Sequence, residues 1–137
     1  MLERLDRCIT NSNVVQFTVE VDGEEERFYG IPVGRSRSLF AIHDISDFHF
    51  DGYRVARIKD IVRLKSGGFG TVAKRILRST GELESHASPA WLRLGSWKSL
   101  LKCLNDRGYC PTVESALTRA DIFSLGEIKD LPTRPLP

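Results

Sequence analysis

The sequence predicts an α+β fold, in which a small antiparallel β-barrel of about five strands packs against two or three helices. Between residues 13 and 65, short apolar segments follow one another with turn residues every eight to twelve positions, which is typical of small barrels and strongly twisted sheets. After residue 66, apolar residues recur at spacings of three and four, which is typical of helices. The chain has 137 residues, of which 41% are hydrophobic and 28% charged, so it can form one ordinary core.

Five strands are expected in the first half of the chain. Apolar and polar residues alternate from Val15 to Val21, as in a strand with one buried face. The pair Asp22-Gly23 favours a tight hairpin turn into a second strand over 28–33, where Pro32 indicates a sheet edge or a bend. The other strands are expected over 39–45, 53–58 and 61–64, with turns at 34–38 and at Asp51-Gly52.

Helices are expected before and after the barrel region along the chain. A short helix is expected over 2–10, and a longer one over 69–79. The apolar stripe of the longer helix consists of Phe69, Val72, Ala73, Ile76 and Leu77. A third helix is expected over 96–107, where Ser96 caps the start. Its buried stripe consists of Trp97, Leu100, Leu101 and Leu104.

The remaining segments complete the predicted organisation. A polar linker is expected over 79–89, and short strands are expected over 109–116 and 122–128, before a Pro-rich tail. We therefore expect residues 1–66 to form an N-terminal helix and a barrel, and residues 67–137 to form a helical extension with short strands and the tail.

The three cysteines and the absence of long apolar segments bear on location. Cys8, Cys103 and Cys110 are odd in number and form no C-x-x-C pair, which argues against a disulfide framework and against a structural zinc site. No run approaches the roughly 18 apolar residues of a membrane span, and the start of the chain does not look like a secretion signal. We expect a cytoplasmic protein that contacts no membrane and needs no cofactor.

One part of the barrel region resembles a known group of proteins. The segments are Phe28 to Gly34, Leu39 to Ile42 and Asp51 to Ile61, of which the last contains the sharpest motif, D-G-Y-x-V-x-R-x-x-D-I. They resemble uncharacterised bacterial proteins with an SH3-like or Sm-like small β-barrel and a helical extension. The resemblance covers roughly residues 13–65 and implies that fold, but it implies no activity. It also implies a second barrel, which we expect to be lost or incomplete here.

Positive charge is concentrated in one stretch of the chain. Residues 1–53 contain five arginines and ten acidic residues, whereas residues 54–78 contain eight basic residues and one acidic residue. A face of this kind attracts phosphate, so these residues are the candidate nucleic-acid-binding set. The set is Arg54, Arg57, Lys59, Arg63, Lys65, Lys74, Arg75 and Arg78. The alternative is that they form ion pairs with nearby acidic residues or only solvate the surface.

Two other patterns contain residue types that occur in functional sites. The glycines of segment 66–74 resemble part of a kinase phosphate loop, but no H-R-D or D-F-G follows, so a hinge before the helix is the preferred interpretation, with binding of a single anion as the alternative. The cluster of His43, Asp44, Asp47, His49 and Asp51 contains metal-ligand types, but a bend near Asp47 would separate them. His86 stands alone in the linker. We therefore predict no catalytic residues, no metal site and no enzymatic activity.

The function expected from these observations is that of a non-catalytic binding or adaptor module. A protein partner or a second copy of the chain is the leading expectation, since exposed strand edges can pair with another strand. The alternative is a small barrel that binds RNA or single-stranded nucleic acid through the 54–78 basic block.

Overall fold

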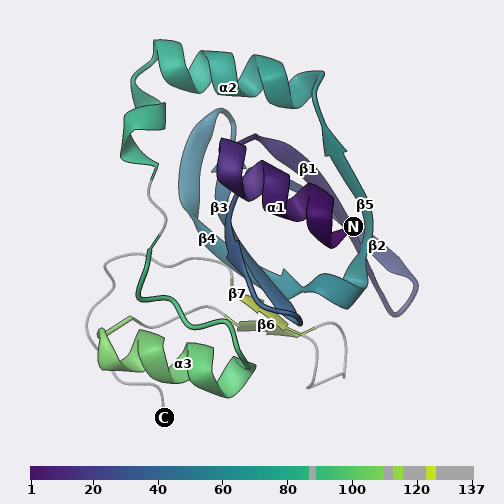
Figure 1. The fold of residues 1–137 in the computed structure, drawn as a ribbon, viewed down its shortest axis with the longest axis vertical. Helices are drawn as coiled ribbons and strands as arrows, with labels where there is room; N and C mark the ends of the chain where they lie inside the picture. The colour runs from purple at the N-terminus through teal and green to yellow at the C-terminus, as the bar shows by residue number, and fades with distance from the viewer. Residues whose placement is uncertain (87–88, 110–112, 116–122, 126–137) are drawn as a thin grey trace.

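A computed structural model of the chain describes residues 1–86, 89–109, 113–115 and 123–125. A five-stranded antiparallel sheet forms its centre, with α2 at one end and α3 at the other, and α1 lying across the open side of the sheet (Figure 1). The sheet consists of β1 (Val15–Val21), β2 (Glu24–Arg35), β3 (Leu39–Ser46), β4 (His49–Arg57) and β5 (Ile61–Ser66). The helices are α1 (Leu2–Asn11), α2 (Phe69–Ser79) and α3 (Trp97–Asp106).

Shorter elements connect these parts. A 3-10 turn, η1 (Ile58–Asp60), joins β4 to β5, and a second one, η2 (Glu82–Ser85), follows α2. A small hairpin consists of β6 (Val113–Ser115) and β7 (Phe123–Leu125). These two strands lie within the predicted strand candidates, whereas the predicted Pro-rich tail lies outside the described residues. In the part of the chain that the structure describes, no helix is both long and apolar enough to cross a membrane.

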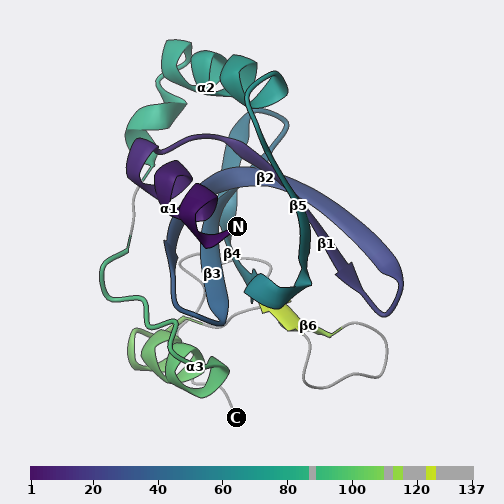
Figure 2. The same cartoon turned by 45° about the vertical axis from the view of Figure 1, so that its right-hand side comes forward.

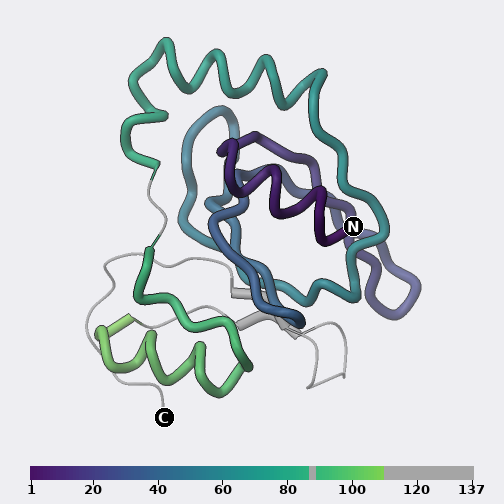
Figure 3. The backbone as a smooth tube through the Cα atoms, viewed as in Figure 1, coloured from purple at the N-terminus to yellow at the C-terminus, as the bar shows by residue number. Residues whose placement is uncertain are grey.

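The strand order is β4-β3-β2-β1-β5, so the α+β class with five antiparallel strands is confirmed. The sheet is strongly bent, as the tube in Figure 3 and the rotated view in Figure 2 both show. Its two ends, β4 and β5, do not pair with each other, so the sheet is not closed into a barrel. Helix α1 lies across the concave side of the bent sheet and contacts β2.

Gly30 shows how the sheet is able to bend. It lies in the middle of β2 opposite Asp44 of β3, and a Cβ atom at this position would lie 2.6 Å from the carbonyl oxygen of His43. Only glycine allows the two strands to approach this closely. Pro32 lies two residues further along, where the pairing of β2 with β3 shifts register. Of the two positions predicted for Pro32, the bend is therefore correct. The sheet edge is wrong, because β2 lies between β3 and β1.

Two predicted boundaries in the sheet differ from the structure. Strand β2 begins at Glu24, directly after the Asp22-Gly23 turn, and is therefore longer than the predicted 28–33. The turn between β3 and β4 is formed by Asp47 and Phe48, which both have positive φ, and the predicted turn at Asp51-Gly52 is wrong. Gly52 uses its positive φ inside β4, close to a shift in the register with β3.

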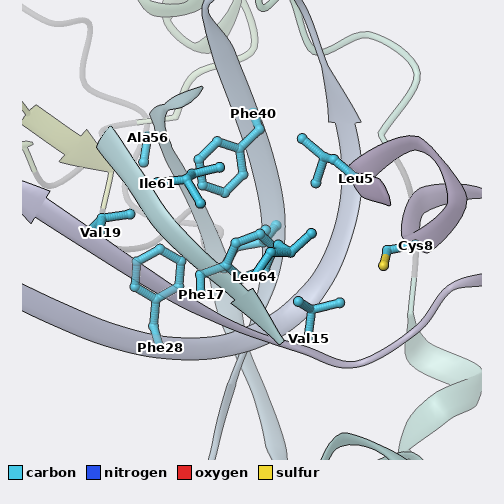
Figure 4. Packing of buried hydrophobic residues seen from close by; sticks show 11 residues of the cluster. Leu5, Cys8, Val15, Phe17, Val19, Phe28, Phe40, Ala56, Ile61 and Leu64 are labelled. Atoms are coloured by element: carbon cyan, nitrogen blue, oxygen red, sulfur yellow. The ribbon is translucent and has the colours of Figure 1, made fainter. Parts of the chain in front are cut away.

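The largest core cluster lies between α1 and the concave side of the sheet. Phe17 stacks between Phe28 and Phe40, with ring centroids 5.4 Å and 5.1 Å away. Leu5 of α1 and Leu64 of β5 approach these rings from the open side (Figure 4). This packing explains the position of α1, because its buried residues complete a core that the sheet leaves open.

Two further clusters attach the other helices. Ala73 and Leu77 of α2 pack on Val14, Ile31 and Ile45. Leu100 and Leu104 of α3 pack on Leu39, Ala41 and Val55. Helix α2 begins and ends where the periodicity predicts, but its buried face is narrower than the predicted stripe, since Phe69 and Val72 remain about half exposed.

Candidate functional site

Arg54 of the basic block is mostly buried on the sheet and forms ion pairs with two acidic residues. Its Nη1 atom donates to Glu26 Oε1 at 2.9 Å, and its Nη2 atom donates to Asp44 Oδ2 at 3.5 Å. The guanidinium also lies 4.6 Å from the ring centroid of Phe28, and only 16% of the side chain is exposed. Burial raises the pKa of Asp44, against the opposing effect of Arg54. Arg54 is therefore part of an internal charge network that a ligand would have to disrupt.

Arg57 is neutralised in a similar way. Its Nε and Nη2 atoms donate to the two carboxylate oxygens of Asp60, at 3.1 Å and 3.2 Å, and its side chain is only 13% exposed. A bidentate pair of this kind is geometrically specific. The pairing alternative considered for the basic block thus holds for Arg54 and Arg57.

The other six residues of the block have different surroundings. Lys59, Arg63, Lys65, Arg75 and Arg78 are exposed, and Lys74 is partly buried, with its Nζ atom donating to the carbonyl oxygen of Asn11 at 3.0 Å. Among the described residues, none of the six forms an ion pair with an acidic side chain. Arg63 and Lys65 lie on β5, while Lys74, Arg75 and Arg78 lie on α2.

The three cations of α2 meet at one groove of about 410 Å³. The groove runs along α2 and is bounded on the other side by the segment between α1 and β1 and by the end of β5. None of the described residues that line it is acidic. Its lining residues are Asn13, Val14, Ser66, Gly67, Gly70, Thr71, Lys74, Arg75 and Arg78.

Glycines position this groove. Gly70 is buried against the chain between α1 and β1, where a Cβ atom would collide with the carbonyl oxygen of Val14. Gly68, directly before α2, has φ 51° and ψ −116°, a conformation that side chains disfavour. The predicted hinge between strand and helix is therefore present here. It turns the chain so that β5 leads directly to the start of α2 (Figure 1).

The two edge strands of the sheet, β5 and β4, have different neighbours. Among the strands that the structure describes, β5 pairs only with β1 and forms one edge of the sheet. One backbone carbonyl of β5 already accepts a hydrogen bond, because Nη2 of Arg4 on α1 donates to the carbonyl oxygen of Leu64 at 2.7 Å. Strand β4 forms the opposite edge of the sheet, and β7 lies against it.

The histidines do not form the cluster considered from the sequence. His43 is buried, and its Nδ1 atom lies 2.9 Å from Nδ1 of His86, so that one ring donates to the other. His49 is exposed and lies near Glu82, with 3.7 Å between Nδ1 and Oε2. The sequence predicts that His86 stands alone in the linker, and this prediction is wrong, because His86 contacts His43. Within the described residues, no group of three or more His, Cys, Asp or Glu is placed to hold a metal ion.

The environment of His43 keeps its ring neutral. It stacks on Phe50 at 3.8 Å and on Tyr53 at 4.4 Å between ring centroids. Burial, and to a lesser extent the neighbouring His86, lowers the pKa of His43 to about 4. Burial, together with the charge of Lys74, also lowers the pKa of His86. A neutral pair tied to η2 and packed on aromatic rings fits a structural role.

The sequence could not have identified several of these neighbours. Arg4 and Asn11 meet β5 and α2 across about 60 residues, and His86 meets His43 across 43 residues. Nothing in their local patterns signals these contacts. The concentration of positive charge did identify the groove residues of α2, because charge density is visible in composition.

Comparisons with known proteins give no external guide. No protein-family model, no curated protein and no solved structure matches the chain.

Proposed function

We propose that the protein is a non-catalytic binding module whose ligand is single-stranded nucleic acid, with RNA as the first candidate. The observation that carries the proposal is the groove along α2, where Lys74, Arg75 and Arg78 converge and where no lining residue in the described part of the chain is acidic. Exposed Arg63 and Lys65 extend the positive charge along β5, which leads into the same groove. Phosphate-rich strands are bound by positively charged tracks of this kind.

The arrangement suits a flexible strand better than a rigid duplex. The cations of the groove lie on one helix face within about one turn, which corresponds to a rise of roughly 6 Å from residue 74 to 78. Each cation can therefore contact a separate phosphate of a strand that adapts its backbone. Three acidic residues, Glu26, Asp44 and Asp60, are paired with Arg54 and Arg57 and oppose this field less than free carboxylates would.

Pairing of strand edges with a protein partner or a second copy has less support. Two β5 edges brought together would place Arg63 and Lys65 near the same residues of the second copy, and like charges on facing strands repel. Charged edge residues and an occupied backbone carbonyl are common ways of preventing edge pairing. Binding of a protein therefore ranks second, with exposed Val62 of β5 as its strongest argument.

We also propose that the bent sheet is an opened form of an SH3-like or Sm-like barrel, located in the cytoplasm. The strand order, with β5 beside β1, and the strong bend of the sheet around α1 support this relationship. The odd number of cysteines without C-x-x-C spacing supports a reducing compartment.

The binding proposal is tested by fluorescence anisotropy with a labelled eight-nucleotide RNA, titrated from about 0.05 to 0.3 M salt. We expect saturable binding that weakens steeply with salt, because each neutralised phosphate contributes a log–log slope of about −0.7. Replacing Arg75→Gln and Arg78→Gln together should make the slope shallower by about 1.4.

A matched double variant controls for net charge. Arg27→Gln and Arg93→Gln remove the same charge from exposed positions outside the groove, so they should leave the slope nearly unchanged. An equal effect of the two double variants would reject the groove as the site. Absence of saturable binding even at low salt would reject nucleic acid as the ligand, and affinity capture from lysate treated with nuclease would then test the protein-partner alternative.

A further inference from the structure

One aromatic ring is exposed at the start of α2, close to the groove. Phe69, the first residue of α2, is 49% exposed, and among the residues whose side chains the structure describes it is the only exposed aromatic one. Its ring contacts Tyr29 and Phe48, with ring centroids 4.7 Å and 5.7 Å away and with tilted planes. These contacts hold the ring in place, while about half of the side chain remains accessible. A flat ligand can therefore stack on it without first ordering the side chain.

The register of the sheet places a cation on the same face as this ring. Gln16 of β1 pairs with Tyr29 of β2 on one side and with Lys65 of β5 on the other. Side chains directly opposite each other in antiparallel strands share a face, so Lys65 lies on the face that carries Tyr29 and Phe69. Two strand spacings, about 10 Å in total, separate the backbones of Tyr29 and Lys65. Lys65 is exposed, so its charge is accessible beside the ring.

The start of α2 connects the ring with the groove. Gly67 lines the groove, and Phe69 follows two residues later. Successive helical residues are rotated by about 100°, so Phe69 lies on the side of α2 away from Lys74 and Arg78. A Cβ atom at Gly67 or Gly68 would have no atom within 4 Å apart from the chain neighbours. The two glycines therefore leave open space through which a strand can pass from the groove to the ring.

The distance between the ring and the far end of the groove suits a short strand. From residue 69 to residue 78, α2 rises about 14 Å. This rise corresponds to roughly four nucleotides at 3.4 Å per nucleotide of a stacked strand, and to fewer if the strand is extended. An eight-nucleotide RNA is therefore long enough to contact the groove cations and the ring together.

We propose that Phe69 is the base-stacking residue of the nucleic-acid site, and that Lys65 binds the phosphate next to the stacked base. This inference rests on the proposed function. It adds a contact with a base, whereas the cations of the groove contact only the phosphate backbone. Stacking on an aromatic ring tolerates every base, so Phe69 adds affinity with little sequence preference.

Substitutions at the two positions separate stacking from charge. Phe69→Leu keeps an apolar side chain but removes the ring, so it should bind the eight-nucleotide RNA roughly tenfold more weakly in fluorescence anisotropy, with an unchanged salt slope. Phe69→Trp retains an aromatic ring and should bind at least as tightly as the wild type. Lys65→Gln should instead make the log–log salt slope shallower by about 0.7, because one phosphate contact is lost.

Matched variants and a ligand without bases control for indirect effects. Val72→Ala changes an apolar side chain of the same helix that is 48% exposed, and Lys102→Gln removes one charge from an exposed position on α3. Both should bind the RNA as the wild type does. An eight-residue abasic strand should bind the wild type roughly tenfold more weakly than the RNA, and should bind Phe69→Leu as it binds the wild type. A purely structural effect of Phe69→Leu would weaken both ligands alike.

The outcomes separate this inference from the proposed function. If the RNA binds with the groove-dependent salt slope, but Phe69→Leu binds it normally or weakens the RNA and the abasic strand alike, stacking is rejected and the groove proposal stands. Equal binding of the RNA and the abasic strand by the wild type has the same meaning and needs no variant. If the RNA does not bind at all, both proposals are rejected. A wild-type dimer in analytical ultracentrifugation that Phe69→Leu dissociates would assign the ring to an interface between two copies of the chain, and would also reject stacking.

Discussion

Acidification is expected to destabilise the fold through the buried pair of His43 and His86. The pKa of His43 is lowered from its ordinary value of 6.5 to about 4, mainly because burial disfavours the charged ring. Between these two values the unfolded chain binds a proton that the folded chain excludes. The stabilisation is therefore complete above pH 6.5 and is lost progressively as the pH falls toward 4. The pKa of His86 is lowered as well, which contributes in the same direction.

The magnitude follows from the shift of His43. Lowering the pH from 7.5 to 5 is expected to reduce the free energy of unfolding by about 2 kcal/mol from this residue alone. A change of that size corresponds to a decrease of roughly 6–10 °C in the melting temperature of a domain of this size. Asp44, whose pKa is raised by burial, acts in the opposite direction at the acidic end, so the comparison is made at pH 5 and above.

The assay is thermal or urea unfolding followed by circular dichroism at pH 7.5, 6.5, 5.5 and 5. His43→Phe keeps a flat ring between Phe50 and Tyr53 and removes the titrating group, so most of the loss of stability on acidification should disappear. His49→Gln, at an exposed position, should behave like the wild type. If His43→Phe loses as much stability between pH 7.5 and 5 as the wild type does, the assignment of the pH dependence to the buried pair is wrong.

Three further outcomes are expected from the packing. Leu5→Ala should lower the free energy of unfolding by about 2–4 kcal/mol in urea denaturation, because Leu5 is fully buried where α1 completes the main core; an effect below 0.5 kcal/mol would contradict that position. Gly30→Ala should be more destabilising than Gly95→Ala in the same assay, since a Cβ atom would meet the His43 carbonyl at 2.6 Å in the first case and no atom within 4 Å in the second. Addition of EDTA or zinc should leave the melting temperature unchanged, and a clear shift with either would reveal a metal site.

Elements with a strong local pattern were predictable. The alternation from Val15 to Val21 and the turn pair Asp22-Gly23 predict β1 and the hairpin that follows, and both are confirmed. Ser96 accepts a hydrogen bond from the backbone N–H of Ser99, as a helix cap does, and α3 begins directly after it. Local backbone preferences and side-chain periodicity act within a few residues, so the sequence alone reveals them.

The errors occur where pairing partners compete with local preference. Asp51-Gly52 has turn chemistry, yet the chain turns at Asp47-Phe48. This earlier turn places His49 opposite Ser46 and Phe50 opposite Ile45, which makes β4 longer than the turn rule predicts. On α2, Phe69 and Val72 belong to the apolar periodicity, but the sheet covers only the part of the helix that carries Ala73 and Leu77. Register and contact area depend on the partner strand and on the sheet, which local rules do not describe.

The amino-acid sequence by itself determined the α+β class, the positions of the helices and most strands, and the concentration of positive charge between residues 54 and 78. Only the tertiary structure decided which of those charges are available. It places Arg54 and Arg57 against Glu26, Asp44 and Asp60, and it brings Lys74, Arg75 and Arg78 to a groove beside Asn13 and Val14. The physical reason is that propensity and periodicity are local, whereas ion pairing, burial and cavities arise from groups that only the folded chain brings together.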